Sequence, residues 1–550
     1  MTHPSPLSRR ALLQRAAWAA SAAAWPRWTL AAQGNARHDP FTLGVASGDP
    51  SPDGMVLWTH LVPAEPGAWS RPIAVRWEVA HDDAFRRIVQ RGTANALPEF
   101  AHSVHVELQG LAPGRWYHYR FLLGDAVSAT GRTRTAPAPG EMEPRLRIAF
   151  ASCQRWEHGH YAAWNDVCRH APDLVLFLGD YMYEYPSPKD PAGLARVHGL
   201  RLAQTLADYR DRYALHKSDP ALQAAHAICP WASTWDDHEV QNDYAGTHGR
   251  GDAADFLAMR TAGWQAFYEH TPLRAASLAA NGFGTLQVYR ALPWGRLANI
   301  HLLDARQFRD RQACRAEGSS GAGAVRPADC AELQAPQRSF LGAAQERWLD
   351  AGLAADARGS AEGSAEGSAG NGNGSGTRWS VIAQQTLFSP RHYPSGVQST
   401  DSWDGYPAAR QRLLQSVARH APRNAVLLGG DIHQNYVCNV LAPSDGAEPA
   451  SPPAARSPSA PRILASEFCG TSISSRSGTT QDKVDAIARH NPHVLLARCD
   501  LRGWGLADVT PGRWTTTLRT VDDPLRADSG ASTLARFVVE DGRAGPVRDS

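Results

Sequence analysis

The sequence has almost no net charge and no long apolar run in the body of the chain, and each shortage excludes a class of protein. Lysine and arginine number 56 against 54 aspartates and glutamates, which gives a formal net charge of +2 over 550 residues. This balance gives no indication of the basic surface that binds nucleic acid. Because a membrane-spanning helix needs about 18 or more consecutive apolar residues, we expect no membrane span.

The first 38 residues contain no acidic side chain, and an arginine pair, Arg9 and Arg10, precedes an alanine-rich apolar stretch. This pattern is typical of a twin-arginine export signal rather than of an anchor. We therefore predict a signal peptide over residues 1–32, recognition by the twin-arginine export machinery, and a periplasmic or secreted protein. The alternative is a disordered basic tail. Because that export route carries folded proteins, it suits a chain that receives a metal before export.

Cysteine is scarce, with 8 residues, and export permits disulfide bonds. Cys314 and Cys330 enclose a Gly/Ala-rich stretch, and we predict that they staple this loop, although spacing alone does not determine pairing. Cys438 and Cys469 lie in apolar runs and are predicted to be small core residues.

Two regions differ in their patterns. Residues 41–135 contain short strand-like runs separated by turn residues, and "LAPGRWY" at 111–117 resembles the tyrosine corner of fibronectin-like domains. We predict a fibronectin/Ig-like β-sandwich there, followed by a Pro-rich linker at 134–144.

From residue 145 to 525, strand-like runs that end in polar residues alternate with helix-like segments such as 199–216 and 254–270. This alternation predicts an α/β domain with a largely buried sheet. Two low-complexity segments, 359–376 and 441–461, are predicted to be surface insertions without a catalytic part.

Polar side chains gather directly after four of the strand-like runs of this second region. They are Ser152 and Cys153, then Asp180 and Tyr183, then Asp236, Asp237, His238, Glu239 and Asn242, and finally Asp431 and His433. The ends of strands in α/β domains are where sites form. Because so many charged groups in one buried place need a partner of opposite charge, we predict a multinuclear metal site.

The types of ligand indicate which ions these are. Aspartate and asparagine oxygens suit Mg, Mn, Ca or ferric ions. A phenolate at neutral pH needs its pKa lowered from about 10, which ferric iron achieves best. We therefore expect Fe(III) near Cys153, Tyr183 and His433, with Asp180 bridging to a second ion. Asp237, Asn242 and Asp431 are expected to hold either that second ion alone or a second and a third ion. The simpler alternative for Cys153 is a thiol packed in the core, and that for Tyr183 is a packed aromatic ring.

Neighbouring polar residues receive supporting roles. Glu184 is expected to be a structural hydrogen-bonding partner, and Asp236 to cap a helix or brace the site. We reject the pair His158 and His160 as ligands, because it lies beyond the strand end. Two arginines are expected to brace nearby acids rather than touch substrate: Arg306 and Arg309 would brace Asp304 and Asp310.

The spacing of Gly-Asp-x-x-Tyr at 179–183, Asp-His-Glu at 237–239 and Gly-Asp-x-His at 430–433 resembles the calcineurin-like metallophosphoesterases. The set of blocks "FASCQ", "LGDYMYEY", "TWDDHEVQNDYAG", "GGDIHQN" and "SEFCGTSISS" more closely resembles the PhoD-type alkaline phosphatase/phosphodiesterase family. This resemblance implies a β-sandwich before a metallophosphoesterase α/β sandwich of two sheets flanked by helices. It also implies one Fe(III) with calcium.

The resemblance also assigns residues. It implies iron ligands at Cys153, Asp180, Tyr183 and His433. It implies calcium ligands at Asp180, Asp237, Asn242 and Asp431, and Gln241 and Asp243 are alternatives to Asn242.

We expect metal-bound hydroxide to hydrolyse a phosphate monoester or diester. His238 would protonate the leaving group or position phosphate, and Arg155 would add positive charge unless it is simply exposed. Other readings are a phosphodiesterase of the phospholipase D type, a phosphate-scavenging binding protein, and a metal-stapled structural protein. The chain is expected to be a monomer.

Overall fold

The computed structural model describes residues 38–65, 67–279, 282–321, 323–361, 376–443 and 461–549. The predicted signal peptide, 1–32, and most of the two low-complexity segments lie outside these described residues. No helix in the described ranges is long and apolar enough to span a membrane.

The largest sheet has ten strands, and its centre is parallel. In spatial order the strands are β26 (Val547–Asp549), β25 (Ala531–Glu540), β24 (Arg513–Val521), β23 (Gly503–Val509), β9 (Leu146–Ala151), β10 (Leu174–Phe177), β11 (Trp231–Ser233), β1 (Val45–Ser51), β2 (Gly54–His60) and β5 (Ser103–Glu107). Strands β9, β10 and β11 run parallel. The four residues of β10 are all buried, which explains why the strand is an unbroken apolar run.

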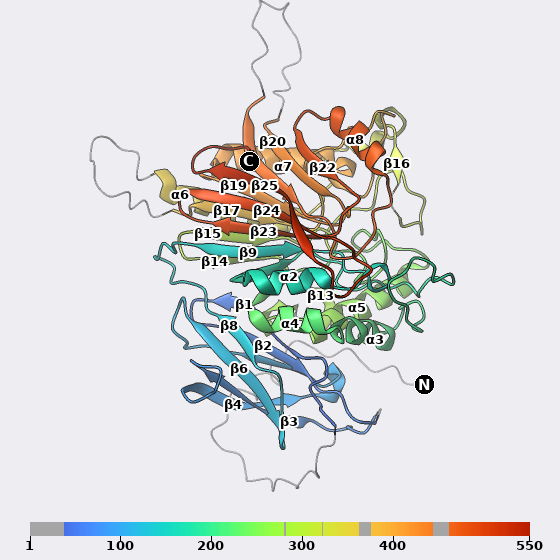
Figure 1. Cartoon of the computed structure of the whole chain (residues 1–550). Coiled ribbons are helices and arrows are strands. Elements are labelled where there is room, and N and C mark those ends of the chain that lie inside the picture. Colours follow the sequence, from blue (N-terminus) through green and yellow to red (C-terminus); the bar gives the residue numbers. More distant parts are fainter. Residues whose placement is uncertain are drawn as a thin grey trace, which may run out of the picture.

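A second sheet of seven strands packs face to face against the first (Figure 1). Its strands are β14 (Arg290–Trp294), β15 (Ala298–Leu302), β17 (Trp379–Ala383), β19 (Ala425–Gly429), β21 (Ile463–Cys469), β20 (Asn435–Leu441) and β22 (Val494–Arg498). Side chains alternate between the faces of a strand. Leu428 of β19 shares one core with Leu176 of β10, whereas the adjacent Leu427 faces the helices.

Helices cover the outer faces of both sheets. On the ten-stranded sheet lie α2 (Ala162–His170), α3 (Leu206–Lys217), α4 (Pro220–Ile228) and α5 (Ala253–His270). On the seven-stranded sheet lie α6 (Ala343–Ala361) and α7 (Pro407–His420), while α8 (Gln481–Arg489) packs on β22. The predicted mixed α/β class is confirmed. Helix α3 begins later than the predicted segment 199–216, because Thr205 and Asp208 form a capping box that starts it.

The N-terminal strands are divided between a small sheet of their own and the ten-stranded sheet. A five-stranded sheet contains β3 (Ile73–Ala80), β4 (Ile88–Ala96), β6 (Trp116–Leu123), β7 (Ala126–Val127) and β8 (Gly131–Arg134). Strands β1, β2 and β5 instead continue the ten-stranded sheet, because Gly48 of β1 pairs with Trp231 of β11. The Tyr117 hydroxyl accepts a hydrogen bond from the Ala112 N–H at 3.0 Å. A separate sandwich domain over 41–135 stays a prediction.

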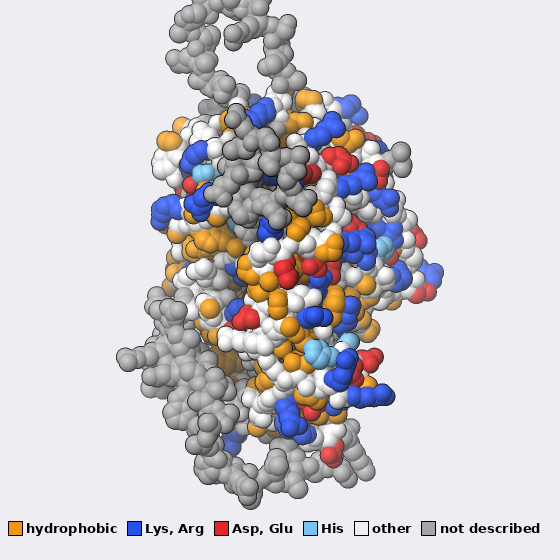
Figure 2. All heavy atoms as spheres, turned by 90° about the vertical axis from the view of Figure 1, so that its left-hand side faces the viewer, with side chains coloured by type: hydrophobic (Ala, Val, Ile, Leu, Met, Phe, Trp, Pro, Cys, Tyr) orange, Lys and Arg blue, Asp and Glu red, His pale blue; other side chains and the backbone are white. Residues whose placement is uncertain are grey.

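Two short strand pairs complete the described fold: β12 (Leu278–Ala279) with β13 (Gly282–Leu286), and β16 (Ala324–Val325) with β18 (Gln398–Ser399). The Cys314–Cys330 disulfide is present, as predicted, and Cys438 and Cys469 are buried and unpaired. On one face of the molecule, basic and acidic side chains are interspersed with apolar ones (Figure 2).

Lys217, at the end of α3, is only 2% exposed and lies against aromatic rings. Its Nζ is 4.1 Å from the Trp58 ring centroid of β2 and 5.3 Å from that of Tyr181. Burial lowers the pKa of this lysine from 10.5 to about 7. Between pH 7 and pH 10.5 the unfolded chain therefore binds more protons than the folded chain, and stability rises with pH over that window.

We expect Lys217→Met to flatten this pH dependence. The lysine contributes a slope of up to about 1.4 kcal/mol per pH unit, because one pKa unit corresponds to that energy. The free energy of unfolding of the variant should exceed that of the wild type most near pH 7 and least near pH 10. Urea unfolding curves recorded from pH 6 to pH 10 test this. Parallel curves for the two proteins across that range would show that Lys217 does not carry the effect.

Candidate metal centre

The predicted ligands lie at the carboxyl ends of strands from both large sheets. Cys153 follows β9, Asp180 follows β10, Asp237 follows β11, and Asp431 and His433 follow β19. Parallel strands deliver the residues after their carboxyl ends to the same edge of a sheet. Backbone hydrogen bonds fix the first two loops to each other, from Cys153 N to Gly179 O at 3.1 Å and from Gln154 N to Asp180 O at 3.0 Å.

Four of these residues adopt backbone angles that side-chain-bearing residues rarely take. The φ angles are +60° at Cys153, +59° at Asp180, +65° at Asp431 and +56° at His433. Such conformations cost about 1–3 kcal/mol each and cluster at functional sites. Gly179, with φ of +109°, adds a steric requirement, because a Cβ there would lie 2.5 Å from Asp236 Cβ.

The first group of ligand atoms contains a thiol, a carboxylate, an imidazole and a phenol. The ligand atoms of Cys153, Asp180 and His433 lie within 4.8 Å of one another. Tyr183 joins them, because its hydroxyl donates to Asp180 Oδ2 at 2.9 Å and lies 3.1 Å from His433 Nε2. The structure thus brings together all four residues that the sequence assigns to iron.

The second group shares Asp180 with the first. Ligand atoms of Asp180, Asp237 and His238 lie within 4.8 Å of one another. Asp431 belongs to neither group, although the charges of Arg306 and Asp237 act on its pKa. The Asn242 side-chain amide donates to the Asp243 carboxylate. The Asp243 backbone N–H in turn donates to Asp237 Oδ2 at 2.5 Å.

The electrostatics of this cluster fit bound cations. Burial raises the pKa of Asp180 well above its usual value, that of Asp236 to about 8 and that of Asp431 to about 6. Asp237 Oδ1 is buried without a hydrogen-bond partner among the described residues. Burial, and next the Asp180 charge, also raises the pKa values of Cys153 and Tyr183. Metal ions would offset this crowded negative charge, and they bind these groups in their deprotonated forms.

His238 is held by a carboxylate partner. Its Nδ1 lies 2.7 Å from Glu184 Oε2, and its ring centroid lies 4.1 Å from that of Tyr183. Burial lowers the pKa of His238, but the charges of Glu184, Asp180 and Asp237 outweigh burial and raise it well above its ordinary value. Glu184 also accepts a hydrogen bond from the Asn242 backbone at 2.9 Å, which agrees with its predicted structural role.

Arg155 lies beside the phenol of the first group rather than in solvent. Its side chain is 18% exposed, and its guanidinium carbon lies 5.7 Å from the Tyr183 ring centroid and 5.5 Å from that of Tyr185. The Nε atom is 3.3 Å from Glu157 Oε2. This carboxylate offsets part of the positive charge.

No role was predicted for two residues that hold the site together, Glu239 and Ser475. Glu239 accepts hydrogen bonds from the backbone N–H groups of Asp180, Tyr181 and Asp236, at 3.2, 2.6 and 2.9 Å. The Ser475 hydroxyl donates to the Tyr183 oxygen at 2.8 Å. The only signals for them were an acidic run after β11 and a serine-rich stretch after β21, and neither pattern specifies a partner.

The predicted partners of Arg306 and Arg309 are wrong. The Arg306 side chain contacts Asp236 at 2.5 Å and Asp401 at 2.7 and 3.0 Å, and Arg309 contacts Asp401 at 2.8 Å. Neither guanidinium group contacts Asp304 or Asp310 in the described structure, although the Arg306 backbone N–H donates to Asp304 Oδ1 at 3.0 Å. Asp401 lies far along the chain, so sequence proximity pointed to the wrong acids.

The rejected histidine pair and the helix-cap alternative for Asp236 can be placed as well. His158 Nδ1 accepts a hydrogen bond from the Arg476 backbone at 3.1 Å, and neither His158 nor His160 belongs to a ligand group in the described ranges. Asp236 braces the site through its contact with Arg306.

Fold and site together define an α/β protein in which the ends of parallel strands bring together two groups of side chains that could hold metal ions. Comparison with known proteins agrees. The model of the PhoD-like phosphatase family matches residues 148–518, and that of the PhoD-like phosphatase N-terminal domain matches residues 27–137. Alkaline phosphatase D of Bacillus subtilis (strain 168) is 40% identical over 520 residues, which cover 92% of this chain and 82% of that protein.

A solved structure of PhoD superposes with a TM-score of 0.81 at 39% identity, covering 94% of this chain and 93% of that one. The chain belongs to the PhoD-like phosphatase family. It is a phosphoric ester hydrolase.

Proposed function

We propose that the protein is an exported, metal-dependent alkaline phosphatase that hydrolyses phosphate monoesters, diesters or both in the periplasm or outside the cell. The observation that carries metal dependence is the position of Asp180, whose carboxylate belongs to both groups of ligand atoms. A carboxylate shared in this way suits two adjacent cations. We also propose residues 41–135 and 145–525 as the N-terminal and catalytic units.

The proposed iron ligands follow the first group of ligand atoms, whereas the proposed calcium ligands share only Asp180 and Asp237 with the second. Cys153, Asp180, Tyr183 and His433 would hold Fe(III). Asp180, Asp237, Asn242 and Asp431 would hold calcium, a choice that rests on the hard oxygen donors and on the family resemblance. When bound, such ions supply a water of lowered pKa and neutralise the charge of a phosphate ester.

The chain itself contributes a proton donor. Because Glu184 accepts from Nδ1 of His238, the Nε2–H of the charged ring is the proton available to a leaving oxygen. The charges of Glu184, Asp180 and Asp237 raise the pKa of His238, which favours the protonated ring. Arg155 adds positive charge beside Tyr183 and helps to attract an anionic ester.

Metal removal tests the proposal. Hydrolysis of p-nitrophenyl phosphate, bis(p-nitrophenyl) phosphate and phosphatidylcholine is measured side by side, before and after chelation with reductive release of iron. We expect activity on at least one of the first two esters to disappear and to return with added iron and calcium. Full activity of the metal-free protein would eliminate metal dependence, and preferred turnover of phosphatidylcholine would favour a phospholipase.

A further inference from the structure

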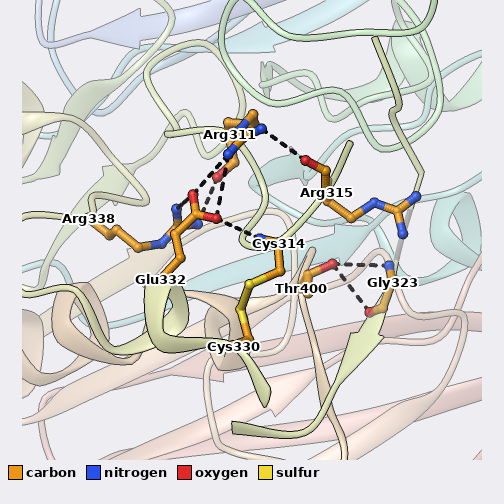
Figure 3. The surroundings of a disulfide bond; sticks show 8 residues. All are labelled: Arg311, Cys314, Arg315, Gly323, Cys330, Glu332, Arg338 and Thr400. Atoms are coloured by element: carbon orange, nitrogen blue, oxygen red, sulfur yellow. Dashed lines mark hydrogen bonds and ion pairs between the residues drawn. A yellow bond between two sulfur atoms is a disulfide. The ribbon is translucent and has the colours of Figure 1, made fainter. Parts of the chain in front are cut away.

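The Cys314–Cys330 disulfide closes a loop whose surroundings Figure 3 shows. At its base, Glu332 accepts a hydrogen bond from the Cys314 N–H at 2.7 Å. At its far end, the Gly323 N–H donates to Thr400 Oγ1 at 3.0 Å. The loop is therefore anchored at both ends by the protein and not by the disulfide alone.

The loop reaches the residue that supports a predicted ligand. A Cβ on Gly321 would lie 3.7 Å from Asp243 Oδ2, and the Asp243 N–H donates to Asp237 Oδ2 at 2.5 Å. Gln312, just before the loop, donates to the Asp243 carbonyl at 2.9 Å. The tip of the loop thus lies beside the second ligand group.

Two arginines converge at this tip. Arg250 Nη2 and Arg315 Nη2 lie 3.6 and 3.9 Å from one point, the position of a Cβ on Gly321. Adjacent loop serines orient them: Arg250 Nε donates to Ser320 Oγ at 3.2 Å, and Arg315 Nη2 donates to Ser319 Oγ at 3.2 Å.

The loop sequence leaves room for one of these guanidinium groups. A Cβ on Gly323 would lie 2.7 Å from Arg315 Nη1, so a larger residue there would displace that arginine. In Figure 3 the Arg315 side chain extends away from the disulfide and ends beside Gly323. The absence of a side chain at Gly323 therefore leaves the space that the Arg315 guanidinium occupies.

Neither arginine forms an ion pair with another described residue. Within the described ranges no carboxylate lies within ion-pair distance of Arg250 or Arg315, whereas Arg311 and Arg338 at the base of the loop both contact Glu332. Arg315 Nε is buried without a hydrogen-bond partner among the described residues. The Asp243 Oδ2 atom lies 3.7 Å from the same Cβ position on Gly321, and the Asn242 amide donates to this carboxylate. Two positive charges against one leave the tip attractive to an anion.

Tyr185 connects this tip to the proposed proton donor. Burial and the Glu184 charge raise the pKa of Tyr185, while the charge of Arg250 lowers it. The Tyr185 ring centroid lies 5.6 Å from that of His238. Tyr185 thus lies beside His238, and Arg250 is close enough for its charge to act on the Tyr185 phenol.

We propose that Arg250 and Arg315 form a second anion subsite that binds a phosphate group of the substrate other than the one being hydrolysed. This inference rests on the proposed phosphoesterase function at the neighbouring metal centre. It specifies the substrate class as phosphate esters that carry a second phosphate, such as polyanionic phosphodiesters. A guanidinium is suited to this role because its planar N–H groups match phosphate oxygens.

A matched pair of substrates tests the subsite. Thymidine 5′-(p-nitrophenyl phosphate) and the same ester with a 3′-phosphate differ only in the second anion. We expect Arg250→Gln and Arg315→Gln each to lower kcat/KM about tenfold for the 3′-phosphorylated ester, mainly through KM, because a charge-assisted hydrogen bond contributes this much. The ester without the 3′-phosphate should change less than twofold. Arg326→Gln, which removes an exposed arginine of the same loop, is the matched control.

Equal losses for both esters would overturn the subsite and indicate that the arginines merely support Asp243. Unchanged values for both esters would also overturn it. A binding assay separates this result from a failure of the proposed function. Propane-1,3-diphosphonate and propylphosphonate are not hydrolysed, and the wild type should bind the first more tightly, with the difference lost in the double arginine variant. Such binding without turnover of any ester would refute the phosphoesterase proposal alone, and no difference in binding would refute the subsite.

Discussion

Asp180→Asn is expected to reduce kcat/KM for p-nitrophenyl phosphate by about a thousandfold or more, an effect of about 4 kcal/mol on the barrier. The substitution keeps the shape of the side chain but removes its negative charge. Because Asp180 belongs to both groups of ligand atoms, no neighbouring carboxylate can replace it in both. The metal content of the purified variant, measured beside its rate, should fall as well.

Asp190→Asn is the matched control for this substitution. Asp190 lies ten positions further on, in an exposed loop, where its carboxylate accepts a hydrogen bond from the Ala192 N–H at 2.9 Å. Its replacement should leave the rate and the metal content unchanged. A wild-type rate in Asp180→Asn would show that the shared carboxylate is not needed, and the two-group account of the site would be wrong.

Arg306→Met is expected to destabilise the protein by about 3–5 kcal/mol, the usual cost of removing one partner from a buried ion pair. Arg306 is fully buried and contacts Asp401 with two nitrogens, at 2.7 and 3.0 Å, and Asp236 at 2.5 Å. Without the guanidinium, two carboxylates remain in the interior with less compensation. Urea unfolding measures this loss.

Arg526→Met serves as the comparison, since Arg526 and its partner Asp528 are 63% and 74% exposed and pairs of that kind contribute at most about 1 kcal/mol. The double variant Arg306→Met/Asp401→Asn should recover part of the loss, because it removes one of the uncompensated charges. If Arg306→Met cost no more than Arg526→Met, Arg306 would not be the brace of the site.

Local sequence patterns were sufficient to predict most of the strands and helices around the site. The apolar run at 174–177 predicted a strand, and its four buried residues confirm it as β10. The segment 254–270 predicted a helix, and α5 covers Ala253–His270. The junction of the N-terminal strands with the large sheet was not predictable. It depends on one bridge between Gly48 and Trp231, and nothing near either residue in the sequence specifies the other.

The site likewise has residues that could be predicted from the sequence and contacts that could not. Cys153, Asp180, Asp237 and His433 could be found because each follows an apolar strand, and parallel strands bring such positions together. The contacts that hold them could not be found. Asp401 joins Arg306 across 95 positions, and Ser475 joins Tyr183 across 292. Such partners follow from the packing of the two sheets, which no short motif records.

The central claim is that this cluster of carboxylate, thiol, phenol and imidazole groups holds metal ions. Elemental analysis of the purified full-length protein, together with its visible spectrum, tests it most directly. We predict about one iron per chain with calcium or another divalent ion, and a visible charge-transfer band that Tyr183→Phe shifts or removes. A colourless protein that contains neither iron nor a divalent ion, yet hydrolyses phosphate esters at its full rate, would contradict the account.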